Sequence, residues 1–359
     1  MDLGRVEVPV APPYPVVVGV GLDLAGIVSG ELEPGVAAIL TDSNVGPLHA
    51  PRVGRALEDA GWHVAEVLEV PAGELSKGLA AYAEVAGALA RAGFTRDGTL
   101  FALGGGVVGD LGGFVAATFM RGIGFVALPT SLLAMVDSSV GGKVGVDLPE
   151  GKNLLGSFLR PRLVAADLDW LQTLPQRELS GGLAEVVKMG LLSGGEYFDD
   201  LDGLGAALAR DPDALRALIL ASVCFKARVV AEDELEAGRR AILNYGHTVG
   251  HGLEAATGYA LPHGEAVSAG MVAAAYLARA RLGADLVSLH VDLLSSAGLP
   301  LRAPAIETEK VLAAMGRDKK RRTGDARHRF VLLEAVGRPV WGVPVAEEEA
   351  RRAIRAVVA

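Results

Sequence analysis

Residues 101–114 read FALGGGVVGDLGGF, an apolar strand-like run followed by a glycine-rich turn that begins a helix-like segment. Gly104, Gly106 and Gly109 fit the pattern G-x-G-x-x-G in a strand–turn–helix context. Glycines in such a turn let backbone N–H groups approach a pyrophosphate at the N-terminus of the helix. Glycine-rich turns also serve plain packing, so the motif alone leaves a nucleotide site and a structural turn equally open.

Strand-like and helix-like segments alternate on both sides of this turn. The strand-like segments are short runs that end in glycine, asparagine or serine, namely YPVVVGVG (14–21), VAAILTDSN (36–44), HVAEVLEVPAG (63–73), GTLFALGGG (98–106) and GFVALPTS (124–131). Between them lie alanine-rich segments with a helical period, such as PRVGRALEDAGW (51–62) and LAAYAEVAGALARAGF (79–94). This alternation predicts βαβ units and a mostly parallel sheet.

The pattern changes after about residue 175. Amphipathic helices rich in alanine and leucine follow, with one candidate hairpin in RHRFVLLEAVGRPVWGVP (327–344). We therefore expect an α/β domain over residues 1–174 and a mainly α-helical domain over residues 175–359, with the boundary between Leu174 and Pro175.

The composition excludes several classes of protein. Of 359 residues, 50% are hydrophobic and 21% charged, and the net charge of -9 argues against nucleic-acid or anionic-membrane partners. No apolar run reaches the length of a membrane span, and MDLGRVEVPV lacks the pattern of a signal peptide, so we expect a cytoplasmic protein. The single cysteine, Cys224, excludes an intrachain disulfide and is expected to pack in the core.

Residues 242–267, ILNYGHTVGHGLEAATGYALPHGEAV, contain three of the seven histidines. His247 and His251 are four apart, so they share one face of a helix, and His263 lies in a Pro-His-Gly-Glu turn before the next helix. Imidazoles in this arrangement suit zinc and its first-row neighbours, although a partly buried polar pair is the alternative.

Three glycines flank these histidines and favour the metal interpretation. Each costs a helix about 1 kcal/mol relative to alanine, which predicts that some group comes close to the backbone there. The three are Gly246, Gly250 and Gly252. Glu185, in the low-charge helical run SGGLAEVVKMGL (180–191), is the best further ligand, because a buried carboxylate needs a cation.

Lysine and arginine residues also occur in otherwise apolar, glycine-rich segments. Each of these residues alone is typical of a solvated surface, but their concentration in such segments predicts a binding site for an anion. The cations are Lys143, Lys152, Lys188, Lys226 and Arg240. Asp137 and Asn153 lie near the first two in the sequence, and Asn244 precedes the histidines. Asp110 follows the last glycine of the turn and is not the usual ribose-binding acid about 20 residues later, which indicates a different kind of dinucleotide site. Candidates for its adenosine side, otherwise ordinary turn and cap residues, are Asp42, Asn44, Glu74 and Lys77.

Together these segments closely resemble the dehydroquinate synthase family of sugar-phosphate cyclases. The matching stretches run from about residue 40 to 320. They are GGGVVGDLGGFVAATFMRG, PTSLLAMVDSSVGGKVGVDLPEGKNLLGSF, GLAEVVKMG, LNYGHTVGHGLE, LPHGEAV and RDKK.

The resemblance implies roles for particular residues. A metal, zinc or cobalt, would be held by Glu185, His247 and His263, whereas His251 would contact the substrate. The substrate pocket would be lined by Asp137, Lys143, Lys152, Asn153, Lys188, Lys226, Asn244 and His251, with one of Lys319 and Lys320. Arg121 would add to the phosphate site, and Arg240 would reach across from a second subunit of a homodimer. NAD would contact Asp42, Asn44, Glu74, Lys77, Gly105, Gly106, Val107, Val108, Gly109, Asp110, Thr130, Ser131, Lys143, Lys152, Trp170, Leu171, Gln172 and Thr173.

The family's reaction accounts for these groups. It converts 3-deoxy-D-arabino-heptulosonate 7-phosphate into 3-dehydroquinate and phosphate, a lyase step of the shikimate pathway to aromatic amino acids. Transient oxidation by NAD is followed by β-elimination of phosphate, reduction and an intramolecular aldol closure, and His251 would handle a proton near the oxidised hydroxyl. The alternatives are a sibling cyclase with another sugar phosphate, a metal-dependent dehydrogenase of the glycerol-dehydrogenase kind, and a non-catalytic NAD- or anion-binding regulator.

Overall fold

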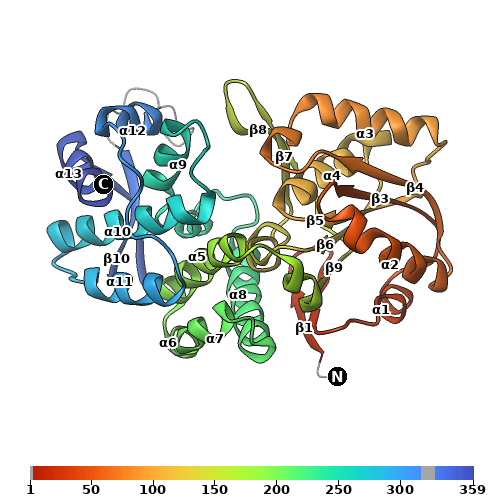
Figure 1. Cartoon of the computed structure of the whole chain (residues 1–359), viewed down its shortest axis with the longest axis horizontal. Helices are drawn as coiled ribbons and strands as arrows, with labels where there is room; N and C mark the ends of the chain where they lie inside the picture. Colours follow the sequence, from red (N-terminus) through yellow and green to blue (C-terminus); the bar gives the residue numbers. More distant parts are fainter. Residues whose placement is uncertain (1–2, 317–327) are drawn as a thin grey trace. The chain divides into compact units, whose positions relative to one another are not determined.

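The computed structural model describes residues 3–316 and 328–359. The chain divides into two compact units, which are Met1–Leu174 with Lys226–Ala231, and Pro175–Phe225 with Glu232–Ala359 (Figure 1). Lys226–Ala231, part of a long helix, belongs with the first unit although nothing in the sequence indicated this. Lys319 and Lys320, one of which was expected to approach the substrate, lie outside the described residues.

The first unit is built on a seven-stranded sheet with the order β1-β2-β9-β6-β5-β3-β4. Its strands are β1 (Gly4–Val8), β2 (Tyr14–Gly19), β3 (Val36–Asp42), β4 (His63–Val70), β5 (Thr99–Gly104), β6 (Gly124–Pro129) and β9 (Leu163–Asp167). Among these seven described strands only β1 pairs antiparallel, so the expectation of a mostly parallel sheet is confirmed. Strands β2, β5, β6 and β9 are buried along their whole length, as in sheets covered by helices on both faces.

Helices cover this sheet on both faces. They are α1 (Leu24–Glu31), α2 (Gly46–Asp59), α3 (Leu79–Arg91) and α4 (Gly106–Thr118), with short turns η1 (Glu74–Ser76), η2 (Phe119–Arg121), η3 (Ala134–Ser138) and η4 (Leu168–Thr173). Figure 1 shows α2 and α3 on opposite sides of β3 and β4. A separate antiparallel hairpin, β7 (Lys143–Leu148) with β8 (Gly151–Phe158), was not predicted.

The strand order reverses between β3 and β5. The chain leaves β3 through α2 to reach β4 on one side, whereas β5 pairs with β3 on the other side and continues through α4 to β6. In open parallel sheets, ligands bind beyond the carboxyl ends of the strands at such a reversal. The glycine turn at the end of β5 therefore lies where a dinucleotide site is expected.

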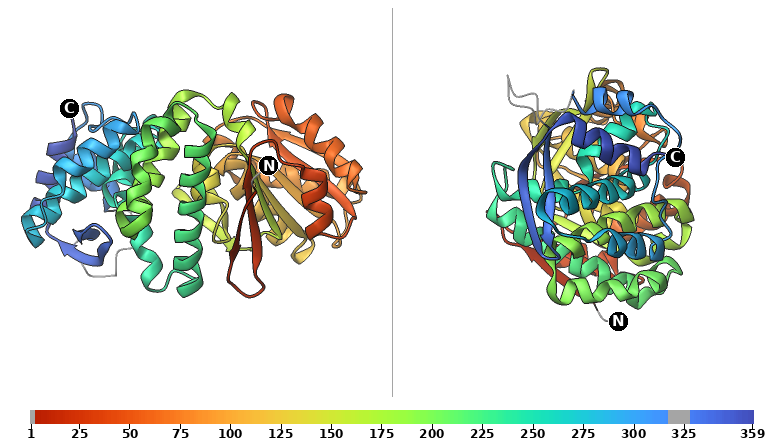
Figure 2. Two further views of the ribbon diagram at one scale, coloured as in Figure 1. Left: turned by 90° about the horizontal axis from the view of Figure 1, so that it is seen from below. Right: turned by 90° about the vertical axis from the view of Figure 1, so that its left-hand side faces the viewer.

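The second unit is mainly helical, as expected. Its helices are α5 (Gln176–Ser193), α6 (Gly195–Asp199), α7 (Leu204–Leu208), α8 (Pro212–Glu232, apart from Lys226–Ala231), α9 (His247–Ala256), α10 (His263–Leu282), α11 (Val287–Ser296), α12 (Thr308–Met315) and α13 (Glu347–Val357), with turns η5 (Asp200–Gly203) and η6 (Arg239–Asn244). The expected hairpin forms as β10 (His328–Ala335) and β11 (Arg338–Val345), and Figure 2 shows this ribbon beside α10.

Two further observations concern the helices. Cys224 is exposed on α8, so its expected place in the core was wrong; α8 buries its flanking Val223 and Phe225 and turns Cys224 outward. Within the described ranges, none of the helices is both long enough and apolar enough to cross a membrane.

Helices α9 and α10 pack at unusually close range, and glycines make this possible. A Cβ on Gly270 would lie 2.0 Å from the Gly246 carbonyl oxygen, and one on Gly250 would lie 3.2 Å from the Ala266 oxygen. A Cβ on Gly252 would lie 2.7 Å from a side-chain atom of Met315 on α12. A close neighbour of the backbone was thus correctly expected at these glycines, but that neighbour is another helix rather than a ligand.

We predict that Gly270→Ala lowers the free energy of unfolding by about 2–3 kcal/mol, because the added methyl group forces α9 and α10 apart. Urea denaturation measures this effect. Gly205→Ala is the matched control, since Gly205 is exposed on α7 and, beyond the backbone of its own helix, no atom of the described residues lies within 4 Å of the place that its methyl group would occupy. Equal stability losses in the two variants would contradict the packing argument.

Candidate active site

Three residues with metal-binding side chains converge in the second unit. Glu185 comes from the middle of α5, while His247 and His263 are the first residues of α9 and α10. The Nε2 atoms of both histidines lie 3.5 Å from Oε1 of Glu185, and one ligand atom from each residue falls within 4.8 Å of the others. The structure therefore brings together the three residues that the resemblance implied as ligands.

The Glu185 carboxylate is fully buried, with 0% of the side chain exposed. Neither of its oxygens accepts a hydrogen bond of acceptable geometry from the described part of the chain, although Lys188 Nζ lies against Oε2. A buried carboxylate without hydrogen bonds is costly unless a cation compensates it. One carboxylate and two imidazoles at this spacing form a donor set that zinc and cobalt accept, so the residues fit a divalent metal.

The two histidines are oriented by different partners. His247 Nδ1 lies 3.0 Å from the Tyr245 carbonyl oxygen, and His263 Nδ1 lies 3.3 Å from Oε2 of Glu254. Burial and the nearby Lys188 ammonium lower the pKa of His247 well below its usual value, which favours the neutral, ligating form. Burial alone would lower the pKa of His263, but its interactions with the Glu185 and Glu254 carboxylates outweigh burial and raise this pKa to about 10.

A buried pair anchors the turn that carries His247. The Tyr245 hydroxyl lies 2.7 Å from Nε2 of His290, and Nδ1 of His290 lies 2.7 Å from the Leu286 carbonyl oxygen. Since only a protonated Nδ1 can donate to that carbonyl, Nε2 of the neutral ring accepts a hydrogen bond from the Tyr245 hydroxyl. Burial lowers the pKa of His290 to about 4. Tyr245 and His290 are 0% exposed, so this bond fixes the start of α9 from inside the unit.

His251 lies one turn along α9 and is exposed. Its ring centroid is 5.1 Å from that of His247 and 6.2 Å from that of His263, and it joins Glu254 and His263 in a second group of neighbouring ligand-type atoms. His251 is therefore beside the Glu185 cluster but not part of it. This agrees with the separate role that the resemblance implied, which remains a prediction.

Two other predicted residues precede the cluster in η6. Asn244 Nδ2 donates to Oε1 of Glu236 at 2.9 Å. Arg240 is 2% exposed and donates to the Glu234 carbonyl oxygen, so its guanidinium is held within its own unit. Its expected contribution to the site of a second subunit stays a prediction.

The glycine turn of the first unit offers a free helix N-terminus. Gly105 is the N-cap of α4 and supplies no side-chain cap. Apart from the backbone of α4 itself, a Cβ on Gly109 would meet no atom of the described residues within 4 Å. A Cβ on Gly106 would lie 3.2 Å from the Ser138 hydroxyl. A helix N-terminus without a side-chain cap fits a phosphate-bearing cofactor. Val107 and Val108 continue the same first turn of α4.

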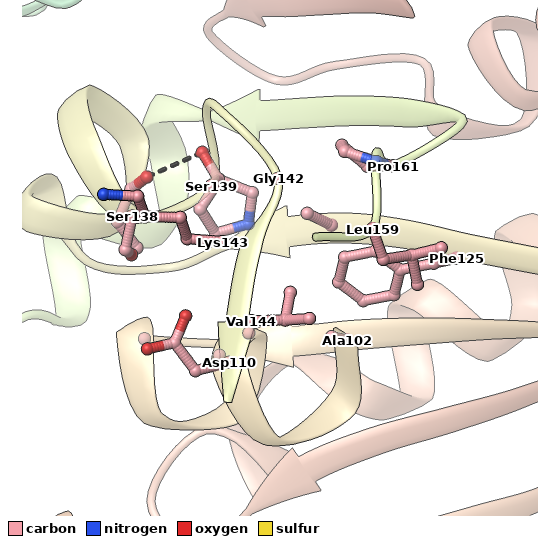
Figure 3. Close-up of a pocket in the computed structure, with 16 residues that line it drawn as sticks. Ala102, Asp110, Phe125, Ser138, Ser139, Gly142, Lys143, Val144, Leu159 and Pro161 are labelled. Atoms are coloured by element: carbon pink, nitrogen blue, oxygen red, sulfur yellow. Dashed lines mark hydrogen bonds between the residues drawn. The ribbon is translucent and has the colours of Figure 1, made fainter. Parts of the chain in front are cut away.

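The adjoining pocket has a polar end and an apolar end (Figure 3). Asp110, Ser138 and Lys143 lie at the polar end. Phe125, Leu159 and Pro161 lie at the apolar end. Such a mixed lining suits a cofactor that carries both charged and ring-shaped parts.

Most of the other expected cofactor residues lie at the carboxyl ends of parallel strands. Asp42 ends β3, where its Oδ1 accepts the N–H groups of Asn44 and Val45 at 2.9 and 3.1 Å. Thr130 and Ser131 follow β6 and are buried and half-buried. The segment after β9 holds Trp170, Leu171, Gln172 and Thr173, of which the first two are buried.

Several of the predicted charges pair with one another. Lys77 Nζ lies 2.5 Å from Oδ2 of Asp110, and Lys152 Nζ lies 3.0 Å from Oε1 of Glu74. Burial alone would lower the pKa of Lys77, but the charge and hydrogen bond of Asp110 raise it. These cations are therefore parts of built ion pairs rather than isolated surface charges.

The remaining predicted residues of the first unit surround η3 and β7–β8. Lys226 Nζ donates to the Asp137 carbonyl oxygen at 2.6 Å and also pairs with the Asp137 carboxylate. Asp137 lies in a π-helical turn, a feature frequent at functional sites. Asn153 takes a left-handed conformation (φ 52°) and its N–H donates to Asp147. Arg121 is exposed and also left-handed, at φ 64°.

Sequence reasoning missed three residues in the surroundings of the Glu185 cluster. Tyr245 and His290 are 45 positions apart, and only the fold brings them together. Glu254 could have been noticed, because it lies seven residues after His247 and so shares a helix face with it.

Known proteins share both the sequence and the geometry of this chain. Two family models cover residues 67–181 and 182–321, described as the N-terminal and C-terminal parts of 3-dehydroquinate synthase. A 3-dehydroquinate synthase of Acidithiobacillus ferrooxidans is 48% identical over 335 residues, which cover 91% of this chain and 90% of that protein.

Solved structures agree with the fold. A 2-deoxy-scyllo-inosose synthase complexed with carbaglucose-6-phosphate, NAD+ and Co2+ superposes with a TM-score of 0.88 at 28% identity, covering 99% of this chain and 100% of that chain. A 2-epi-5-epi-valiolone synthase from Streptomyces hygroscopicus subsp. jinggangensis 5008, with NAD+ and Zn2+ bound, gives 0.86 at 28% identity and 96% coverage of each chain.

The fold and the cluster define a class of two-unit proteins, in which a parallel α/β unit is joined to a helical unit that carries a metal-type site. Within this class, the chain belongs to the 3-dehydroquinate synthase family. The resemblance inferred from the sequence is thus confirmed.

The Tyr245–His290 pair predicts a loss of stability in acid. Above pH 6.5 the His290 imidazole is neutral in both states and has no effect. Between pH 6.5 and about 4 the unfolded chain binds a proton that the folded chain does not, so the free energy of unfolding falls as the pH falls. The full difference amounts to about 3 kcal/mol below the folded-state pKa.

Urea denaturation at about pH 7 and about pH 4.5 measures this dependence. His290→Gln, which cannot titrate, should lose less stability between the two pH values than the unaltered protein. His63→Gln, at an exposed position on β4, is the control and should behave like the unaltered protein. The same pH dependence in all three proteins would show that His290 does not contribute.

Proposed function

We propose that this chain converts 3-deoxy-D-arabino-heptulosonate 7-phosphate into 3-dehydroquinate and phosphate, as a carbon–oxygen lyase that uses NAD and a divalent metal. The observation that carries the proposal is the buried Glu185–His247–His263 cluster in a chain of this family. We further propose a division of labour in which residues 1–174 bind NAD and residues 175–359 hold the metal and substrate groups.

Glu185, His247 and His263 would hold the metal, either zinc or cobalt. When bound, such an ion supplies Lewis-acid polarisation of a substrate hydroxyl. Lys188 lies beside Glu185, and only 1% of its side chain is exposed, so the surrounding protein holds its ammonium group in place. This fixed positive charge would stabilise an anionic group of the substrate. The bound metal of the similar synthases, Co2+ in one and Zn2+ in the other, supports this donor set without selecting between the two ions.

The glycine turn would hold NAD through the N-terminus of α4. When bound, NAD supplies a hydride acceptor that is regenerated within one turnover. Gly105 supplies no side-chain cap to the first N–H groups of α4, which leaves them for the pyrophosphate. Asp42 lies at the end of the neighbouring strand β3, on the side expected for the adenosine. Lys143, Lys152 and Asn153 would bind substrate or cofactor anions from the β7–β8 hairpin.

The remaining proposed roles follow from the family. The carboxylate, hydroxyl and phosphate groups of the substrate would be oriented by Lys226, Asp137, Asn244 and Arg121. Arg240 would reach the substrate site of a neighbouring subunit in a homodimer. We also propose a cytoplasmic location, as the resemblance implies.

The direct test is release of phosphate from 3-deoxy-D-arabino-heptulosonate 7-phosphate by the purified protein with catalytic NAD and zinc or cobalt. We expect phosphate and dehydroquinate to form in equal amounts, without net NADH, and activity to stop when a chelator removes the metal. Steady accumulation of NADH with a polyol would instead support a dehydrogenase. Tight NAD binding without turnover of any sugar phosphate would support a regulator, and turnover of a different sugar phosphate would support a sibling cyclase.

We predict that His251→Ala lowers kcat by about 100-fold, because His251 lies beside the cluster and would carry a proton to or from the oxidised hydroxyl. Steady-state kinetics at saturating metal and NAD measure the loss. His63→Ala, at an exposed position on β4, should leave kcat unchanged. Full activity of the His251 variant would exclude this role.

A further inference from the structure

Glu254 is a buried carboxylate that the proposed reaction does not use. It lies on α9, two turns after His247, and is 3% exposed. Its Oε2 atom lies 3.3 Å from Nδ1 of His263, the first residue of α10. The carboxylate is therefore directed at the back of a proposed metal ligand, on the ring nitrogen opposite the one that faces Glu185.

This contact determines which His263 nitrogen is free. A carboxylate accepts hydrogen bonds only, so Nδ1 must carry the proton when it bonds to Glu254. In the neutral ring Nε2 then has its lone pair available, and Nε2 is the atom that lies 3.5 Å from Glu185 Oε1. Carboxylates that bond to the outer nitrogen of a metal-binding histidine fix its orientation and strengthen its donor character.

The two histidines differ in how much support they have without Glu254. The Nδ1 of His247 is bonded to the carbonyl oxygen of Tyr245, a backbone group whose own residue is anchored by His290. His263 instead follows residues 257–262, which join α9 to α10, and 30% of its side chain is exposed. Within the described part of the chain, the hydrogen-bond partner of its Nδ1 is the side chain of Glu254.

The connection between α9 and α10 also folds onto Glu254. The Thr257 hydroxyl and the Tyr259 N–H both donate to the Glu254 carbonyl oxygen, at 2.9 and 2.7 Å. The residue thus ties its carboxylate to His263 and its backbone to the connecting segment. A change in its side chain alone leaves those backbone bonds in place.

We propose that Glu254 is a positioning residue, which holds the His263 imidazole with Nε2 toward the metal and increases the affinity of the cluster for divalent ions. This inference rests on the proposed metal site and adds a residue outside the three ligands. It assigns Glu254 no contact with substrate or cofactor.

A second metal ion is the main competing explanation, because His251, Glu254 and His263 also form a group of neighbouring ligand-type atoms. Such an ion would have to replace the proton between Nδ1 of His263 and Glu254. His251, its third ligand, is exposed and would lose side-chain freedom on binding. The two explanations differ in stoichiometry, since positioning requires one ion per chain and the alternative requires two.

The experiment uses Co2+ as the probe, added to the full chain after removal of metal with a chelator. Affinity is measured by competition with a chelating dye, geometry by the visible absorption of bound Co2+, and stoichiometry by equilibrium dialysis. We compare Glu254→Gln, which keeps the shape and an acceptor oxygen, with Glu254→Leu, which removes the acceptor. Glu178→Gln, exposed in the first turn of α5, is the matched control.

We expect affinity for Co2+ to fall about 100-fold in Glu254→Leu and about 10-fold in Glu254→Gln, with an altered absorption spectrum in both and the larger change in Glu254→Leu. The control should match the unaltered protein, and circular dichroism should show each variant folded. If Glu254→Leu does not fold, Glu254→Gln decides, and unchanged affinity and spectrum in that variant would overturn the proposal. Two Co2+ ions in the unaltered protein and one in Glu254→Leu would also overturn it, in favour of the second metal site.

Failure of the proposed function would appear differently. Glu185→Gln alters a proposed ligand and should weaken Co2+ binding more than either Glu254 variant. If Glu185→Gln binds Co2+ normally, the metal site itself is wrong, whereas weak binding by Glu185→Gln with normal binding by Glu254→Leu overturns only the role of Glu254. Neither measurement requires a substrate.

Discussion

The burial of the Glu185 carboxylate is the constraint on which the second unit depends. A fully buried carboxylate without hydrogen bonds destabilises a fold unless positive charge is held close to it. Lys188 supplies one charge from the same helix, and the two imidazoles of α9 and α10 face the carboxylate from the other helices. Three helices must therefore meet at one point, and their packing has to bring their ends there accurately.

Glycine packing provides that accuracy. His247 and His263 are both first residues of helices, so small shifts between α9 and α10 would move the two imidazoles relative to each other. Gly246, Gly250 and Gly270 allow backbone-to-backbone contact that a single methyl group would prevent. Such contact leaves few alternative arrangements of the two helices, because backbone atoms cannot repack as side chains can. The site is thus held by main-chain contacts as well as by hydrogen bonds.

Much of this could be predicted from the sequence, and the exceptions have physical causes. The five strands around the glycine turn and the late hairpin could be predicted because their apolar runs end at clear turn residues. The β7–β8 hairpin could not, since β8 carries Leu154, Leu155 and Phe158 without the alternation of a half-buried strand. The grouping of Glu185, His247 and His263 could be expected because the family resemblance implies that they bind one metal. The contact between Tyr245 and His290 could not, because it depends on the path of α10 and α11.

The charges around the cluster also bear on what the site can bind. Glu185 and Glu254 contribute two buried negative charges, and Lys188 contributes one positive charge. Because the pKa of His263 is raised to about 10, its imidazole adds a second positive charge near neutral pH in the metal-free protein, and the formal charges of these four groups sum to about zero. A divalent ion that displaces the His263 proton would bring the sum to about one positive charge, which favours an anionic sugar phosphate. The loaded cluster is thus more attractive to the proposed substrate than the metal-free cluster is, which favours binding of metal before substrate.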